Sequence, residues 1–189
     1  MKHRIDNNAF PYPMPIVLVG SMVNGKPNFM AVAWVSRVNV HPPLIAIALG
    51  AHLTNQGIRD GKEFSINIHG VSLMEKTDYC GLFSGAKIDK SAIFKVHYGE
   101  LKNAPLIEEC PVAMACRLFQ AVQLPDHELF IGEIAEAYCD PAYKSNDKPD
   151  IRKIKPFTLS MPDNRYWTVG DAAGKAWSAG AGLRKTLQK

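Results

Sequence analysis

Three stretches in the first half of the chain contain polar and aromatic residues that could together hold a planar molecule with an anionic end. They are KPNFMAVAWVSRV (26–38), HLTNQ (52–56) and FSGAKIDK (83–90). In the second stretch, the junction of a strand and a helix offers free backbone N–H groups and the Thr54 hydroxyl, which suit a phosphate. Lys87 or Lys90 could add a point charge, and Trp34 offers a flat apolar wall with one hydrogen-bond donor.

Each of these residues also has a simpler structural interpretation. Trp34 is more often a core residue than part of a ligand site, and Thr54 is most simply the cap of a helix. Ser84 and Gly85 could merely end a helix, and lysine side chains are usually solvated. A ligand site is favoured because a planar wall and an anion subsite are both provided for between residues 28 and 90.

The elements that must position these residues are mostly strands. The Asn24-Gly25 pair favours positive φ at both central positions of a turn, which predicts a β-hairpin around it. Pro125 and Asp126 join two long apolar stretches and suit a second hairpin. Alternating or wholly apolar patterns predict strands over residues 16–19, 26–38, 42–49, 63–68, 111–124 and 127–139.

Two short helices are predicted between these strands. One covers 54–61, with Thr54 or Asn55 as its N-cap. The other covers about 73–82, because Ser72 and Glu75 have the spacing of a capping box. Residues 140–155, which are rich in Pro, Asp and Lys, are predicted to form a surface loop.

This arrangement predicts a mainly β (α+β) fold, either a barrel or a sandwich. Strands in hairpins with few helices need closure or stacking to remove exposed sheet edges. The chain has no βαβ alternation, no GxGxxG motif and no P-loop, which argues against Rossmann and NTPase folds. With 189 residues, 47% of them apolar, we expect one domain spanning 1–189.

Charge, hydropathy and cysteine usage argue against several functional classes. The net charge is +4 without a strong basic block, so we expect no nucleic acid partner. No run of 18 apolar residues and no signal-peptide core is present, so we expect no membrane association. The 4 cysteines are widely spaced without a CxxC, which argues against a zinc site and predicts reduced thiols and a cytoplasmic location.

Five motifs resemble those of one known family. They are NGKPNFMAVAW, HPPLIAIAL, the turn at Thr54, DYCGLFSGAKIDK and DHELFIGEI. Their order and spacing are similar to the flavoredoxin branch of the flavin reductase-like, FMN-binding split-barrel family, over roughly residues 13–138, with a looser likeness in YWTVGDAAGKAW. The resemblance implies a six-stranded antiparallel split barrel that forms a homodimer and holds FMN noncovalently near the dimer interface.

The resemblance also implies roles for individual residues. Thr54 and its neighbours would bind the phosphate, Lys90 would add charge, and Trp34 with Asn28 would flank the ribityl chain and ring edge. His127 matches a histidine near the nicotinamide side in related flavin reductases, although a histidine that opens a strand is usually a surface residue. The implied cofactor-binding residues are Asn28, Met30, Trp34, Val35, Ser36, His52, Thr54, Asn55, Ser84, Gly85, Lys87 and Lys90.

Two departures from the family pattern affect the expected site. A basic residue is usual after the third strand, but this chain has Gly50 and Ala51, which leaves that contact to His52. Cys80 stands where family members often have Phe or Tyr. We expect Cys80 to be a packing residue, because no cationic neighbour in the sequence would lower its pKa.

The implied activity is that of an FMN-dependent oxidoreductase that takes electrons from NAD(P)H or a redox partner. The acceptor would be flavin, ferric iron or a protein. No protein nucleophile is expected, because the chain has no GxSxG, no HExxH and no cysteine with a nearby histidine. Two alternatives are a pure FMN electron carrier without an NAD(P)H site, and a protein that stores or senses flavin. The aromatic tail over 166–189 is expected to pack at the dimer interface.

Overall fold

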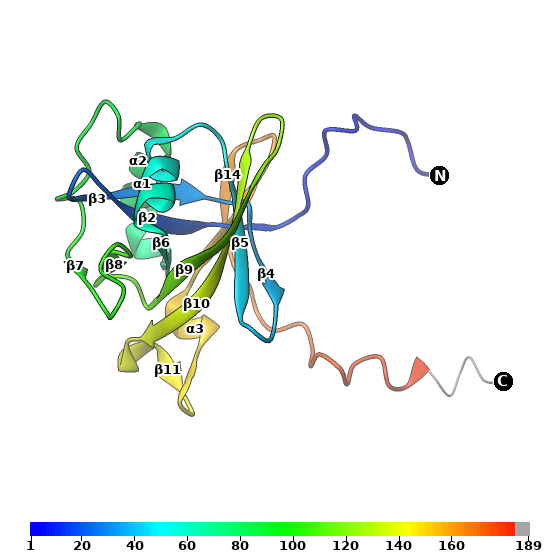
Figure 1. Ribbon diagram of the computed structural model, residues 1–189. Helices are drawn as coiled ribbons and strands as arrows, with labels where there is room; N and C mark the ends of the chain where they lie inside the picture. The colour runs from blue at the N-terminus through cyan, green and yellow to red at the C-terminus, as the bar shows by residue number, and fades with distance from the viewer. Residues whose placement is uncertain (184–189) are drawn as a thin grey trace.

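The computed structural model describes residues 1–183, and its main element is a seven-stranded antiparallel sheet. The strand order is β3-β2-β6-β9-β10-β5-β4 (Figure 1). The two edge strands, β3 and β4, follow each other in the chain, so the sheet has to curl until its edges approach one another. The strands are β2 (Val17–Val23), β3 (Lys26–Val32), β4 (Val35–Asn39), β5 (Leu44–Leu49), β6 (Glu63–Ile68), β9 (Val112–Gln123) and β10 (Glu128–Cys139).

The predicted strand over 26–38 is wrong as a single element, because the chain changes partners at its middle. β3 pairs with β2, whereas β4 pairs with β5 at the opposite edge of the sheet. The change occurs at Trp34, whose carbonyl oxygen accepts a hydrogen bond of 3.0 Å from the Ala48 amide. The implied count of six strands therefore becomes seven, and no hydrogen-bonded ladder within residues 1–183 joins β3 to β4.

Both predicted hairpins are confirmed. Asn24 and Gly25 have φ of 50° and 75°, the positive values that the turn between β2 and β3 requires. β9 and β10 form the second hairpin, with irregularities in register after Ile131 and after Ile134. The predicted strand over 42–49 begins two residues later, at Leu44, because the preceding prolines lie in a turn.

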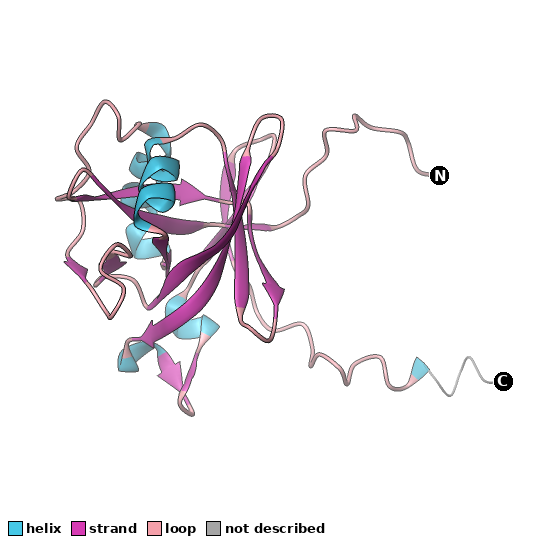
Figure 2. Cartoon of the chain, viewed as in Figure 1, coloured by secondary structure: helices cyan, strands magenta, loops and turns pink. Residues whose placement is uncertain are grey.

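Helices α1 (Leu53–Gly61) and α2 (Met74–Leu82) lie on one side of the molecule (Figure 2). Both predicted helix starts are wrong in detail. His52, not Thr54 or Asn55, occupies the N-cap of α1, and it makes no side-chain cap bond. The proposed capping box at Ser72 does not form, because a 3₁₀ turn (η1, Val71–Leu73) leads into α2 and its N-cap is Leu73.

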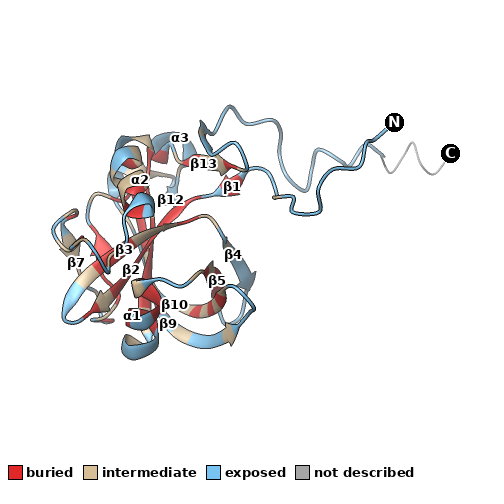
Figure 3. Cartoon of the chain, turned by 90° about the horizontal axis from the view of Figure 1, so that it is seen from above, coloured by how far each residue is buried: buried red, intermediate tan, exposed pale blue. Residues whose placement is uncertain are grey.

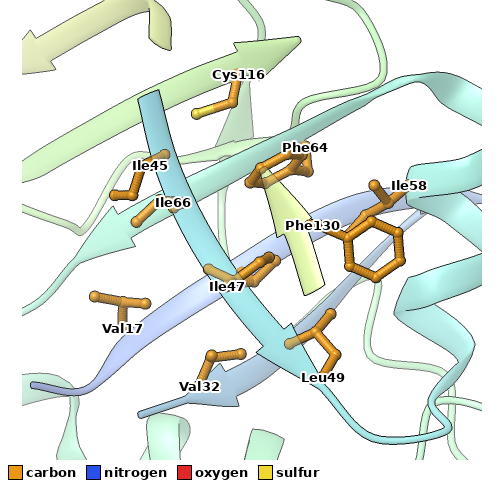
Figure 4. Close-up of a cluster of buried hydrophobic side chains, with 11 residues drawn as sticks. Val17, Val32, Ile45, Ile47, Leu49, Ile58, Phe64, Ile66, Cys116 and Phe130 are labelled. Carbon is orange, nitrogen blue, oxygen red and sulfur yellow. The ribbon is translucent and has the colours of Figure 1, made fainter. Parts of the chain in front are cut away.

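The core lies inside the curl of the sheet and contains Val17, Val32, Ile47, Phe64 and Phe130, among others (Figure 4). Helix α1 contributes Ile58 to this cluster. Successive side chains of a strand point to opposite faces, so neighbours in one strand enter different clusters. Val17 and Val19 of β2 lie in the first cluster, whereas Leu18 lies in a second cluster with Cys80 of α2, so both faces of β2 are covered. This explains why β2 is apolar on both faces.

The remaining elements are short. β1 (Met14–Pro15), β13 (Phe157–Ser160) and β14 (Arg165–Thr168) form a small sheet, and β7 (Val96–His97) pairs with β8 (Leu106–Ile107). The stretch predicted as a surface loop contains η2 (Pro141–Tyr143), β11 (Lys144–Ser145), β12 (Lys148–Pro149) and α3 (Ile151–Ile154). Ile154 of that stretch is buried.

Both terminal segments extend away from the body on the same side and are almost entirely exposed (Figure 3). Residues 184–189, the end of the predicted aromatic tail, lie outside the described residues. Within the described part of the chain, no helix has the length and apolar character needed to cross a membrane.

Candidate functional site

Three cavities lie side by side around the beginning of α1. The first has a volume of about 530 Å³ and lies between α1 and the β9–β10 turn. The second, of about 210 Å³, lies between α1, β3 and the end of α2. The third, of about 350 Å³, lies between the β2–β3 turn and residues 85–90. His52 and Leu53 border the first two cavities, and Leu53, Gly85 and Lys90 border the last two.

A hydrogen bond between β3 and α1 joins a residue of the second cavity, Thr54, to one of the third, Asn28. Asn28 Nδ2 donates to Thr54 Oγ1 at 2.8 Å, and both side chains are buried. This bond explains why Thr54 does not cap the helix, because its hydroxyl is already engaged with a residue 26 positions away. Gly85 packs directly on the Asn28 amide oxygen, and a Cβ at this position would overlap that atom. A larger residue at position 85 would have to displace the Asn28 side chain.

Lys90 is buried between the second and third cavities, with only 4% of its surface exposed. Its Nζ donates to the carbonyl oxygens of Phe83 at 2.8 Å and Cys80 at 3.2 Å, at the C-terminal end of α2. Burial lowers the pKa of this ammonium group. An ammonium has three protons to donate, so one remains for an anion after these two bonds.

Cys80 and His52 also line the second cavity. Burial raises the pKa of the Cys80 thiol to about 11, with small opposing effects of Lys90 and Lys76. A neutral, buried thiol is a poor nucleophile, and Cys80, 2% exposed, belongs to the cluster that contains Leu18, as expected of a packing residue. The pKa of His52 is lowered by burial first, and then by the charges of Lys90 and His127.

An aromatic pair stands beside the first cavity. The rings of Trp34 and His127 are 4.5 Å apart between centroids and inclined by 33°. A Cβ added to Gly50 would lie 3.6 Å from His52 Nε2 and 3.9 Å from His127 Nε2. The two imidazoles therefore flank the same point of the chain, and the Trp34 ring packs on that of His127.

Polar contacts fix the wall of the first cavity between α1 and β10. The guanidinium of Arg59 forms an ion pair with the buried carboxylate of Glu128. Asn55 Nδ2 donates to the Gly50 carbonyl oxygen at 2.9 Å and to Glu128 Oε2 at 3.4 Å. Because Glu128 follows His127 directly, these contacts hold the His127 backbone against α1.

The structure brings together most, but not all, of the residues predicted from the sequence. Trp34 reaches the first cavity only through its contact with His127. Val35 packs against the core instead, and the exposed Ser36 donates to the Arg37 carbonyl oxygen, so neither lines these three cavities. Cavity-lining residues from the prediction are Asn28, Met30, His52, Thr54, Asn55, Ser84, Gly85, Lys87, Lys90 and His127.

Sequence reasoning missed several residues of the site. Arg59 and Glu128 were not identified, although Glu128 adjoins the predicted His127. Lys26 and Asp89 were also missed, and their side chains form an ion pair of 2.7 Å beside the third cavity. Their positions next to the Asn24-Gly25 turn and to Lys90 were the available signals.

Comparison with known proteins identifies the family and the fold. A family model described as "Flavin reductase like domain" matches residues 9–160. The crystal structure of flavoredoxin from Methanosarcina acetivorans is 48% identical, covers 97% of this chain and 99% of that one, and aligns with a TM-score of 0.95. Flavoredoxin of Desulfovibrio vulgaris (Miyazaki F) is 34% identical, with coverage of 95% and 100% and a TM-score of 0.87.

A more distant structure bears on the fold alone. A Shewanella frigidimarina NCIMB 400 protein with a split barrel domain is 20% identical, covers 88% of this chain and 87% of that one, and has a TM-score of 0.75. The curled sheet with its unpaired β3 and β4 edges is thus the split-barrel fold. The family match over most of the chain, together with the identity to two flavoredoxins, shows that this protein belongs to the flavin reductase-like family.

Proposed function

We propose that the protein is an FMN-dependent oxidoreductase that receives electrons from NAD(P)H or a redox partner and passes them to flavin, ferric iron or a protein acceptor. The observation that carries the proposal is that the first and second cavities are neighbours, because His52 and Leu53 line both. The Trp34–His127 ring pair stands beside the first cavity, and the buried Lys90 ammonium lines the second.

The residues present fit FMN in size and in chemistry. Ligand cavities commonly measure about 300–1,000 Å³, and the first and second cavities, of about 530 and 210 Å³, together fall in that range. The second is too small for a ring system and a phosphate together. The ring system fits the first cavity and the phosphate fits the second, where Thr54, Ser84 and Lys90 supply polar and charged groups.

The chain's own residues would bind and orient the flavin and exclude water from it. A bound flavin supplies hydride acceptance and one-electron donation. Lys90 would neutralise part of the phosphate charge, and its remaining N–H would donate a hydrogen bond to a phosphate oxygen. His127 and Trp34 would present a flat face to the ring system. His52 would contact the anionic chain between them, as its place on both cavities allows.

The alternative of a pure electron carrier is favoured by the high identity to flavoredoxins. The two functions differ in whether NADH or NADPH reduces the protein directly. The purified protein is expected to be yellow and to lose its visible absorbance on anaerobic addition of one of these nucleotides. Reduction by dithionite but by neither nucleotide would contradict an oxidoreductase that takes its electrons from NAD(P)H and would support the carrier. A colourless protein that takes up no FMN would contradict both.

Two copies of the chain are proposed to associate through the side from which the terminal segments extend. Trp34, Val38 and Val40 are exposed along the open edge of β4, and Tyr12 and Trp177 are exposed on the extended segments. Apolar side chains gathered at an open strand edge favour pairing with another copy. Sedimentation velocity at micromolar concentration should give the mass of a dimer, and a monomer would contradict this proposal.

A further inference from the structure

A fourth cavity lies between α3 and the chain that leaves β14, apart from the three cavities around α1. Its volume is about 480 Å³, and none of its lining residues borders the other three cavities. α3 lies well away from α1 in both Figure 1 and Figure 3. A volume of about 300–1,000 Å³ is usual for a small-molecule site. The fourth cavity is therefore large enough for a ligand of its own, and the proposed function makes no use of it.

One part of the wall of this cavity is aliphatic. Val71 comes from the turn before α2, Ile151 from α3, Pro156 from the residue before β13, and Val169 from the residue after β14. Ile151 and Val169 are exposed. No aromatic residue within 1–183 lines the cavity. An aliphatic chain that covers these side chains removes apolar surface from water, which favours binding.

Two positive charges without a partner stand in the same cavity. Arg152 and Lys155 are both exposed, and neither side chain takes part in an ion pair within residues 1–183. Asp171 is the one carboxylate among the described residues of the wall. Two positive charges and one negative charge leave a balance of +1. The cavity is thus complementary in charge to a ligand that carries one negative charge.

Backbone contacts fix one wall of the cavity and leave donors free on the other. The Val71 amide donates to the Lys155 carbonyl oxygen at 3.0 Å, and a Cβ on Gly70 would overlap the Ile154 carbonyl oxygen. The turn before α2 therefore packs directly on the end of α3. On the opposite side, the amides of residues 169–171 make no backbone hydrogen bond within residues 1–183, so they can donate to an anion.

We propose that the fourth cavity binds an amphipathic carboxylate, a small molecule with one carboxylate and an aliphatic chain. Arg152 and Lys155 receive the carboxylate, to which a guanidinium can donate two parallel hydrogen bonds. The chain lies against Val71, Ile151 and Val169. This site is independent of the proposed function, because it shares no residue with the cavities assigned to FMN.

Octanoate is the probe for this site, and octanol, which has the same chain without the charge, is its matched control. Amide chemical shifts of the isotope-labelled, full-length protein are followed during titration with each compound in the presence of excess FMN. Octanoate is expected to shift the amides of Val71 and of residues 168–171. It should bind at least about tenfold more tightly than octanol, because a hydrogen bond between charged partners is stronger than one between neutral groups.

Three variants separate the contributions of charge and of apolar contact. Arg152→Gln/Lys155→Gln should weaken octanoate binding by about tenfold or more and octanol binding by less than about threefold. Lys153→Gln should change neither, because this lysine of α3 does not border the cavity and donates to the Lys144 carbonyl oxygen. Val169→Ser, at an exposed position, should weaken the binding of both compounds.

Three results would overturn the inference. The first is the absence of octanoate-induced shifts at residues 168–171, which is the result expected if a second copy of the chain covers the cavity. The second is equal affinity for octanoate and octanol. The third is a folded Arg152→Gln/Lys155→Gln protein that binds octanoate as the wild type does. If circular dichroism shows that this double variant is unfolded, the comparison of octanoate with octanol and the Val169→Ser variant decide. Failure of the protein to bind FMN would contradict the proposed function and would leave this test unaffected.

Discussion

Replacement of Lys90 by methionine is expected to raise the dissociation constant for FMN by about 10- to 150-fold. The basis is a hydrogen bond between charged partners, which contributes about 1.5–3 kcal/mol. Lys90 is 4% exposed and borders the second and third cavities, so its ammonium acts in a site shielded from solvent. Shielding from water strengthens the interaction with a phosphate. Methionine keeps most of the side-chain volume while removing the charge and all three donors.

The Lys90 prediction needs controls that separate phosphate binding from local structure. Lys90 also donates to the Phe83 and Cys80 carbonyl oxygens, so its loss leaves two acceptors at the end of α2 without their donor. Riboflavin, which has no phosphate, reports on that structural effect and should lose much less affinity than FMN. Lys148→Met removes an exposed lysine on β12, which borders none of the three cavities, and should change FMN affinity by less than about threefold.

Fluorescence quenching of FMN and riboflavin, titrated with each variant, measures both effects. If Lys90→Met binds FMN as tightly as the wild type does, the phosphate does not lie at Lys90. An equal loss for FMN and riboflavin would mean that Lys90 acts by supporting the end of α2. Thermal unfolding of each variant shows whether the fold is retained before the affinities are compared.

Local signals in the sequence account for most of the strands. The Asn24-Gly25 turn and the strand β6 depend on residues that are neighbours in the sequence, and both were predicted correctly. The exchange of partners at Trp34 could not be predicted in this way. Residues 26–38 read as one pattern, and the break depends on Ala48, 14 positions later, which donates to the Trp34 carbonyl. Pairing across a sheet is decided by packing, which outweighs local preference.

The same limit applies to the site. Thr54 was expected to cap α1, because a hydroxyl at a helix start usually does so. Its hydroxyl instead accepts a hydrogen bond from the Asn28 amide on β3. Lys90 was predicted as a charge near the phosphate, yet its burial could not be read from the sequence, where lysine indicates exposure. Residue types therefore identified what the site contains, and tertiary contacts decide how each group is presented.

His69 is a buried group that is expected to make the free energy of unfolding depend strongly on pH. It follows β6, is 1% exposed and packs on Phe157 with ring centroids 4.6 Å apart. Neither ring nitrogen has a hydrogen-bond partner within residues 1–183. Burial lowers the pKa of His69 from 6.5 to about 4. The folded protein therefore holds this imidazole neutral at a pH where the unfolded chain already protonates it.

The sign of the pH effect follows from that difference. Above about pH 7.5 the imidazole is neutral in both states and contributes no pH dependence. As the pH falls from about 7.5 to about 4, the unfolded chain binds a proton that the folded protein does not, so the free energy of unfolding decreases. Between about pH 7.5 and about pH 5 the loss should be about 2 kcal/mol, from the same relation.

His69→Leu should remove this part of the pH dependence, because leucine packs against Phe157 without a titrating group. Urea unfolding of the flavin-free protein, followed by circular dichroism at several pH values, gives the free energy of unfolding for each variant. The difference between the wild type and His69→Leu isolates the imidazole from the carboxylates that titrate in the same range. His41→Leu, at an exposed position, controls for the loss of a histidine and should keep the wild-type slope. If the His69→Leu curve runs parallel to the wild-type curve across this range, the buried imidazole is not the group that makes the fold sensitive to acid.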